Sequence, residues 1–442
     1  MTRSRTVSAT DAAAVAADGV VFGYPLVLMN RIRAWMTAAP APDPARMRAP
    51  PNRFVHARAL PAAVSGRPEA RTGALRSAAW LDLGATPVVL SVPETHGRFY
   101  ALSLVDLWTN VFASVGARTT GTGAGRYVIA GPSWSGTALP EGALLIRAPT
   151  QMVRIAGATQ VDAEDRFAEA HAVQDAYELR PLVPGRAPPD VVEPAVVRTA
   201  PAAQVEQMDA RTFFTELTAQ MRDNPPRLED RAIVERMRRL GLLLEGDLAW
   251  RRLDREARRA VSLGAARGLE RVMTAAESPP GDTVGHWHIR FRLGQHGTDY
   301  LDRAAAACAG LEAGPAEDEL PVLTKTDVDG RELSGRRRYS ISFAPCTLPP
   351  VHGYWTLMTY DAREPLVDNP VEPYSIGDWN GLVPESDGTV TIRIQHVDPG
   401  PDAPNWLPAP PGPFNLLLQL CWPQREVLDR RWTPPAVTPI GS

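Results

Sequence analysis

Apolar and polar residues alternate along short segments in the first half of the chain. From Ala74 onward, apolar side chains recur at every second position, and turn residues separate the segments. A period of two is typical of β-strands that bury one face. The predicted strands are 88–92, 98–115, 127–130, 144–147 and 152–155, with one more around Trp80 and Asp82. A short amphipathic helix is predicted over residues 162–174.

The same alternation returns in the last third of the chain. Tyr339, Ile341 and Phe343 alternate with serines, residues 390–395 alternate in the same way, and an apolar run at 414–420 lies between prolines. Asp-Gly pairs at 329–330 and 387–388 are typical of tight turns between strands. This pattern predicts a second sandwich of the jelly-roll type.

Two other regions have helical spacing. Residues 11–37 predict a helix with a break at Gly23-Tyr24-Pro25, because proline disrupts helix interiors. Helices are also predicted over 212–223, 228–240 and 248–275, where β-branched residues are few. Prolines at 225–226 and 279–280 separate the first two of these helices and end the third.

Proline is abundant in this chain, and its clusters mark the predicted domain boundaries. The sequence contains 43 prolines, roughly twice the average usage, which argues against a helical bundle. We expect a mostly β protein with two β-sandwich or jelly-roll-like domains and a small helical domain between them. The predicted parts are an N-terminal helical segment (1–45), a first β-sandwich (46–185), a proline-rich linker (186–204), a helical domain (205–280) and a C-terminal sandwich (281–442).

Charge and cysteine content narrow the classes of partner. The 47 basic and 50 acidic residues give 47 − 50 = −3 and a pI near 6.3, which argues against nucleic acid and anionic membrane partners. Cys308, Cys346 and Cys421 are odd in number and widely spaced, so neither a disulfide framework nor a zinc ribbon is expected. With no apolar span of 18 residues expected, the predicted compartment is the cytoplasm. The oligomeric state stays open.

The familiar catalytic and cofactor motifs are not matched. Residues 121–125 lack the GxGxxG spacing and the Walker lysine, and residues 131–135 lack the second glycine of GxSxG. Glu94 and His96 could form an acid/base pair, although a solvated turn is the favoured interpretation. We therefore predict no cofactor.

His286 and His288 are the candidate metal ligands in this sequence. Two imidazoles spaced by one residue on a strand share a face, as in some metal sites. A cupin-like site would need a glutamate about four residues further on, where Phe291 and Arg292 stand instead. No metal is predicted, and a role for the two histidines is left open.

The best local constellation is Asp106, Trp108 and Asn110. If residues 98–115 form one strand, these three side chains project to the same face. Trp80 and Asp82 repeat the pairing of an aromatic residue with a carboxylate on a neighbouring strand. Such polar groups among apolar neighbours either hydrogen-bond one another in a structural network or line a pocket. We favour the structural network. The alternative, a polar and aromatic patch that lines a pocket, is the interpretation that would give these residues a function.

Around these residues the sequence resembles a bacterial family that pairs two domains of unknown function. The N-terminal part resembles the domain of unknown function 1254 and the C-terminal part the domain of unknown function 1214. The first resemblance rests on residues 77–83, 87–94, 97–112 and 129–132. The second rests on residues 353–357, 360–361, 366–369, 374–377, 405–410 and 432–435. The resemblance implies two β-sandwiches with a small helical module between them, and no settled activity.

Several departures from the family pattern concern polar positions. The family usually has an Asn-x-Asp-Thr-Leu-Tyr run where this chain has residues 71–76, and arginines common in the family are Ala158, Pro373 and Gln419 here. We expect a divergent member whose ligand is less charged than the usual one.

Two functions follow from this constellation. One is a cofactor-independent enzyme acting on a small, largely uncharged organic metabolite, with Asp106 or Asp82 as general acid/base and Asn110 positioning a carbonyl or hydroxyl. The alternative is a non-catalytic small-molecule or carbohydrate-binding or interaction protein on the same scaffold. In either case the expected partner is a small molecule, in a cleft lined by aromatic and amide side chains. The predicted substrate-binding residues are Trp80, Trp108, Tyr360, Asn369, Tyr374 and Trp406.

Overall fold

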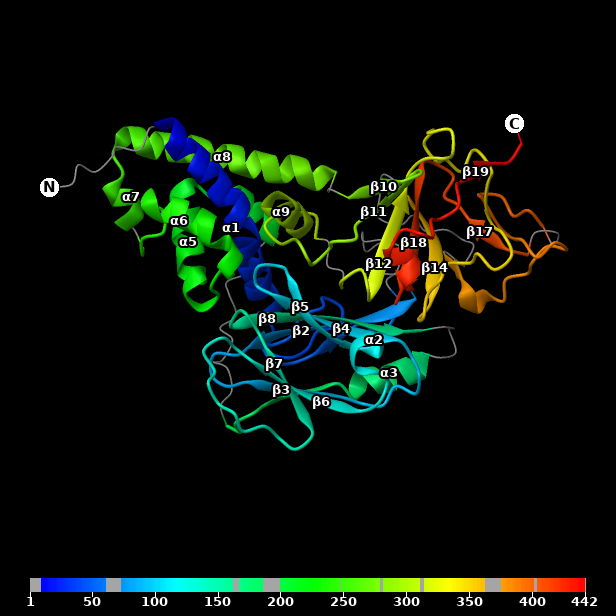
Figure 1. The fold of residues 1–442 in the computed structure, drawn as a ribbon, viewed down its shortest axis with the longest axis horizontal. Helices are drawn as coiled ribbons and strands as arrows, with labels where there is room; N and C mark the ends of the chain where they lie inside the picture. The colour runs from blue at the N-terminus through cyan, green and yellow to red at the C-terminus, as the bar shows by residue number, and fades with distance from the viewer. Residues whose placement is uncertain are drawn as a thin grey trace.

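A computed structural model describes residues 9–60, 73–161, 167–185, 199–246, 248–278, 281–310, 314–361, 375–400 and 404–441. Within these residues the chain forms three lobes: a first β-sandwich, a group of helices and a second β-sandwich (Figure 1). The predicted mostly β fold, with helices between two sandwiches, is confirmed.

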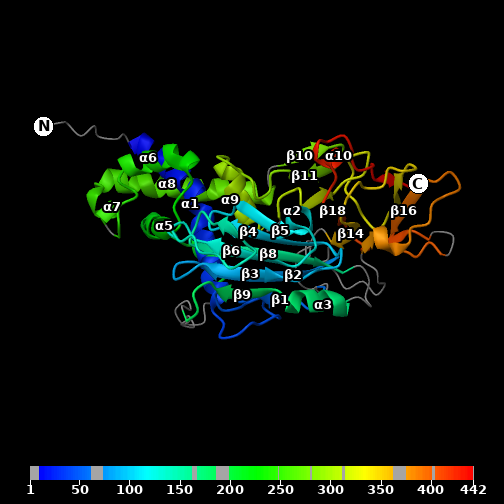
Figure 2. The same ribbon diagram turned by 60° about the horizontal axis from the view of Figure 1, so that its bottom comes forward.

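The first β-sandwich packs a five-stranded sheet on a four-stranded sheet (Figure 2). The strand orders are β1-β2-β8-β4-β5 and β7-β6-β3-β9. The elements are β1 (Val55–His56), β2 (Ala74–Asp82), β3 (Val88–Val92), β4 (Tyr100–Asp106), β5 (Val111–Gly116), α2 (Ala117–Thr120), β6 (Gly125–Ala130), β7 (Ala143–Arg147), β8 (Met152–Gln160), α3 (Phe167–Asp175) and β9 (Glu178–Pro181). Inward apolar residues such as Leu81, Leu102 and Ile129 fill the space between the sheets.

The helical lobe is built around the N-terminal helix. Its elements are α1 (Ala9–Thr37), α4 (Pro201–Glu206), α5 (Ala210–Asp223), a 3₁₀ turn (Leu228–Asp230), α6 (Arg231–Arg239), α7 (Leu248–Arg252), α8 (Arg255–Glu277) and α9 (Tyr300–Cys308). Helix α1 contacts α4, α5, α6, α8 and α9, so it shares one core with residues that follow it by about 200 positions. The sequence pattern does not predict α9.

The predicted break in the first helix is wrong. Helix α1 continues through Gly23 and Pro25. A Cβ at Gly23 would lie 2.6 Å from a methyl carbon of Leu217, so the missing side chain lets α5 approach closely. Packing on several sides therefore outweighs the hydrogen bond that Pro25 cannot donate.

The expectation that the chain has no long apolar span is also wrong. Among the described residues, the helix over Thr10–Thr37 is long and apolar enough to cross a membrane, and an 18-residue window within it has a mean hydropathy of 1.7. This is weak evidence, because a buried core helix passes the same test and 72% of the window is buried inside the protein.

The predicted helix over 248–275 is two helices. Helix α7 ends at Arg252, and Asp254 then caps α8 by accepting a hydrogen bond from the Ala257 backbone N–H at 2.7 Å. An N-terminal cap of this kind begins a new helix.

The second β-sandwich packs a six-stranded sheet on a four-stranded sheet. Their orders are β10-β11-β12-β18-β14-β15 and β17-β16-β13-β19. The elements are β10 (Asp282–Val284), β11 (Trp287–Ile289), β12 (Glu319–Thr324), β13 (Tyr339–Phe343), β14 (Trp355–Asp361), β15 (Ser375–Gly377), a 3₁₀ turn (Asp378–Asn380), β16 (Val390–Gln395), β17 (Trp406–Pro408), β18 (Phe414–Cys421), α10 (Arg425–Leu428) and β19 (Thr438–Pro439).

The two sandwiches contact each other directly. Arg76 of β2 donates from one nitrogen to both carboxylate oxygens of Glu319 at 3.1 and 3.2 Å, and Arg118 donates to Asp318 at 2.5 Å. The buried Tyr354 belongs to the apolar core of the first sandwich, although it immediately precedes β14. These contacts fix the position of one sandwich on the other.

Candidate functional site

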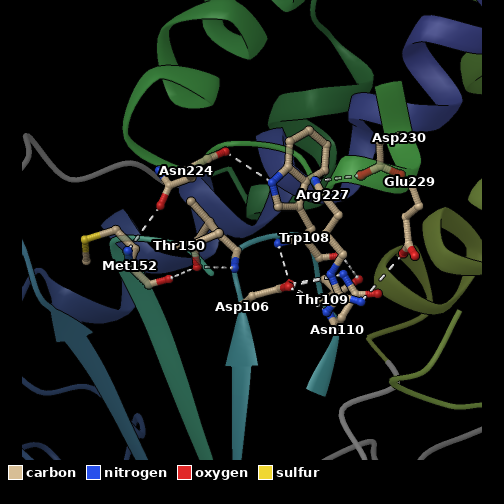
Figure 3. Close-up of polar contacts among 11 residues, drawn as sticks. Asp106, Trp108, Thr109, Asn110, Thr150, Met152, Asn224, Arg227, Glu229 and Asp230 are labelled. Carbon is tan, nitrogen blue, oxygen red and sulfur yellow. Dashed lines mark hydrogen bonds and ion pairs between the residues drawn. The ribbon is translucent and has the colours of Figure 1, made fainter. Parts of the chain in front are cut away.

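Asp106, Trp108 and Asn110 lie in a tight turn rather than along one strand. Strand β4 ends at Asp106 and β5 begins at Val111, so the predicted single strand over 98–115 is wrong. One oxygen of Asp106 accepts hydrogen bonds from the backbone N–H groups of Trp108 at 2.9 Å and Asn110 at 2.8 Å (Figure 3). Short-range bonding of this kind is how aspartate reverses the chain.

Asp106 is completely buried and bound on both of its oxygens. Its second oxygen accepts from the guanidinium of Arg227 at 3.1 Å, and the amide of Asn110 lies 3.2 and 3.3 Å from the two oxygens. Burial raises the pKa of Asp106 above its ordinary value, against the opposing charge of Arg227 and the hydrogen bonds from Asn110.

The indole of Trp108 ties this turn to the helical lobe. Its Nε1–H donates to the backbone oxygen of Asn224 at 3.2 Å, and the Asn224 side chain accepts from the Met152 backbone N–H at 3.1 Å (Figure 3). The hydroxyl of Thr150 accepts from the Leu107 N–H at 3.2 Å and donates to the Met152 oxygen at 2.7 Å. The sheet edge and the loop after α5 are thereby joined by buried hydrogen bonds.

Four polar residues of this junction are not predicted from the sequence: Asn224, Arg227, Asp230 and Arg303. Asn224 and Arg227 flank Pro225-Pro226, a signal that identifies a turn but not its contacts. The Arg227 backbone N–H donates to the buried Asp230 at 3.0 Å, and burial raises the pKa of Asp230. Arg303 of α9 is completely buried beside them.

Trp80 and Asp82 lie at the end of β2, and their side chains make different kinds of contact. Trp80 is buried in the core that contains α1, and its Nε1 has no hydrogen-bond partner among the described residues. The guanidinium of Arg154 lies 5.8 Å from the centre of the Trp80 ring. The carboxylate of Asp82 accepts from the Gly84 backbone N–H at 2.9 Å and so closes a turn.

The predicted binding residues of the second sandwich lie elsewhere. Tyr360 is on β14 and Trp406 is on β17, where the indole Nε1 donates to the Gln395 backbone oxygen at 3.0 Å. Trp80 and Trp108 belong instead to the core around α1. The described aromatic residues are therefore not gathered in one cluster. Asn369 and Tyr374 lie outside the described residues.

The histidine positions examined for metal or acid/base chemistry are dispersed. His286 lies just before β11 and His288 lies within it, and the described residues contain no group of three or more metal-ligating side chains. Glu94 and His96 are exposed in a loop, with 3.6 Å between Nδ1 of His96 and the glutamate oxygen.

An apolar pocket lies in the second sandwich, away from every predicted site residue. The guanidinium of Arg430 at its edge stacks 4.9 Å from the Phe291 ring and forms an ion pair with Asp282 at 2.7 Å. The pocket is lined by Val284, Ile289, Phe291, Val322, Leu420, Val427, Arg430, Trp432, Thr433 and Pro434.

Two family models and two solved structures are similar to this chain. The model described as "Protein of unknown function (DUF1254)" matches residues 51–181, and "Protein of unknown function (DUF1214)" matches residues 318–425. The VPA0106 protein from Vibrio parahaemolyticus has a similar fold, with 19% identity and a TM-score of 0.73 over 97% of this chain and 100% of that one.

A second solved structure, a putative uncharacterized protein from Burkholderia cenocepacia, is 11% identical with a TM-score of 0.45 over 96% of this chain and 88% of its own. No curated protein matches the sequence.

Proposed function

We propose that this chain, which belongs to the family that joins a DUF1254 domain to a DUF1214 domain in that order, is a non-catalytic protein that binds a small organic molecule. The observation that carries this proposal is the state of Asp106. Its exposure is zero, and its oxygens are used by four hydrogen-bond donors of the protein itself.

A general acid or base must come within hydrogen-bond reach of a substrate proton. Asp106 cannot do so while Arg227 and the turn to Asn110 hold it, and one oxygen of Asp82 closes the turn to Gly84. The contacts of Asp106 therefore support a structural role rather than a catalytic one, and the contact of Asp82 is of the same kind. Within the described residues, the same junction leaves other buried polar atoms unpaired, which favours a bound molecule over a reaction.

One observation favours the enzyme alternative. The pKa of Asp106 is raised by burial, and a carboxylic acid held neutral in a buried site is typical of catalytic acids. In that reading, Asp106 would be the acid and Asn110 would orient a carbonyl or hydroxyl of the substrate.

The experiment that separates the two functions uses Asp106→Asn with Asp82→Asn as its control. Purified proteins are incubated with a metabolite extract, and mass spectrometry measures which compounds are retained and which are consumed. A binding protein retains a compound unchanged, and Asp106→Asn lowers the melting temperature because an amide N–H₂ then faces the Arg227 guanidinium. Consumption of a compound by wild type, lost in Asp106→Asn at an unchanged melting temperature, would refute the proposal.

A further inference from the structure

Arg303 is a fully buried guanidinium that has no hydrogen-bond partner in the part of the chain that the structure describes. None of its three side-chain nitrogens has a partner among the described residues, although the side chain is 0% exposed. Its five N–H groups therefore face the protein interior unsatisfied. Leaving such donors unpaired is costly, and an exception of this size calls for a bound group.

The surroundings of Arg303 are aromatic on three sides. Its guanidinium carbon lies 5.5 Å from the ring centre of Phe22, 5.5 Å from that of Trp108 and 5.1 Å from that of Tyr300. These rings hold the cation by cation–π attraction and exclude bulk water. They come from α1, the turn after β4 and α9, so all three meet at this point.

Two unpaired acceptors belong to the same junction. Among the described residues, Asp230 Oδ1 and Asn110 Oδ1 are buried and have no hydrogen-bond partner within bonding distance, and the Tyr300 hydroxyl interacts with the Asp230 carboxylate and opposes the rise of its pKa. The charges of Asp230 and Asp106 act on Arg303, but neither carboxylate forms a hydrogen bond or ion pair with it within the described ranges. In Figure 3, Asp230 lies at the backbone end of Arg227 and Asn110 lies at its guanidinium end. The junction thus combines an unused cationic donor set with two unused acceptor oxygens.

We propose that Arg303, Asp230 and Asn110 bind a small zwitterion of the α-amino acid class, an inference that rests on the proposed binding function. A carboxylate matches the planar fork of Arg303, and an ammonium group supplies the donors that the Asp230 and Asn110 oxygens lack.

Charge balance selects a zwitterion over a simple ion. Arg227 and Arg303 face Asp106 and Asp230, with Glu229 lying 3.8 Å from Arg227 at the more exposed edge, and a net-neutral ligand leaves the sum of these charges unchanged. A lone carboxylate would add a buried negative charge and leave both acceptors unpaired, and a lone amine would leave Arg303 unpaired. This ligand class carries two charges and no net charge, so it meets the expectation of a largely uncharged metabolite only in its net charge.

The experiment uses glycine, the smallest zwitterion of this class, together with its two halves, acetate and methylammonium. Calorimetric titration of the whole protein measures affinity for each. We expect glycine to bind and each half to bind at least about 100-fold more weakly, because each leaves one side of the site unsatisfied. Arg303→Gln should weaken glycine binding by about 100-fold and Asp230→Asn by about tenfold. Arg271→Gln, an exposed change on α8, is the matched control and should bind like wild type.

A second measurement does not depend on any variant folding. Wild-type crystals soaked in glycine are compared with unsoaked crystals at the Arg303 site. Density for a carboxylate on Arg303 and an amine on Asp230 supports the proposal. Ordered water alone on Arg303 in the soaked crystals, or equal binding of acetate and glycine, would overturn it. If glycine does not bind and another compound is retained unchanged, this inference fails while the binding function stands. If compounds are only consumed, the binding function itself fails.

Discussion

Removal of the Arg227 charge tests the junction most directly. Arg227→Met keeps most of the side-chain length but leaves the buried Asp106 carboxylate without its cation. Breaking a buried ion pair from one side costs about 3–5 kcal/mol. The Arg227 side chain is 30% exposed, so solvent screens part of this interaction and we expect a loss of about 2–3 kcal/mol.

The loss should depend on pH in a defined direction. Burial raises the folded pKa of Asp106, and the Arg227 charge opposes that rise, so the variant has a still higher folded pKa. A raised folded pKa means that stability is present at low pH and is lost as pH rises through that pKa. The deficit of Arg227→Met is therefore largest near pH 8 and shrinks as the pH falls toward 4, because acidification favours the protonated form of Asp106 in both proteins.

The assay is urea unfolding followed by tryptophan fluorescence at both pH values. Arg222→Met is the control, because Arg222 forms an ion pair with Glu245 in which both side chains are largely exposed. That pair should contribute at most about 1 kcal/mol, with little difference between the two pH values. A deficit for Arg227→Met below about 0.5 kcal/mol at pH 8, or one that does not shrink on acidification, would refute the reasoning.

Three further predictions concern other buried contacts. Thr150→Val should lose about 1–3 kcal/mol in chemical unfolding, because the Leu107 N–H loses its acceptor, whereas Thr150→Ser should stay close to wild type. Gly268→Ala should lower the melting temperature, at a cost of about 1–3 kcal/mol, since its Cβ would lie 2.5 Å from the Ala17 oxygen; an unchanged melting temperature would contradict the close crossing of α1 and α8. Burial lowers the pKa of His56 to about 4, so the stability it contributes is complete above its unfolded pKa and falls as pH drops toward 4. After discount for partial exposure we expect a fall of about 2 kcal/mol between pH 7 and pH 4, which His56→Gln should flatten in pH-dependent thermal unfolding.

Local patterns predicted most strands well and failed where a side chain reversed the chain. Strand β3 occupies exactly the predicted residues 88–92, because its alternation is uninterrupted. The predicted strand over 98–115 also alternates, but Asp106 captures two backbone N–H groups and ends β4. Periodicity alone does not distinguish an aspartate that points from a strand from one that closes a turn.

The candidate site could be predicted only in part, because its partners are distant in the sequence. Asp106, Trp108 and Asn110 stand out in the sequence as polar and aromatic residues among apolar neighbours. Their partners Asn224 and Arg227 lie more than a hundred positions away, in a loop whose only local signal is a pair of prolines. Short-range spacing carries no information about contacts at that separation.

By itself the sequence determined the fold class, the family and the alternation that buries one face of each strand, because these depend on local periodicity and on matched runs of residues. The tertiary structure decided which lobes share a core and what the polar residues do. Asp106 and Arg227 are 121 residues apart, and their ion pair exists only because α1 and the loop after α5 pack against the end of the first sheet. Arg303 has its unusual state for the same physical reason: burial, and the absence of a partner within the described residues, arise where α1 and α9 meet the turn after β4 around one side chain.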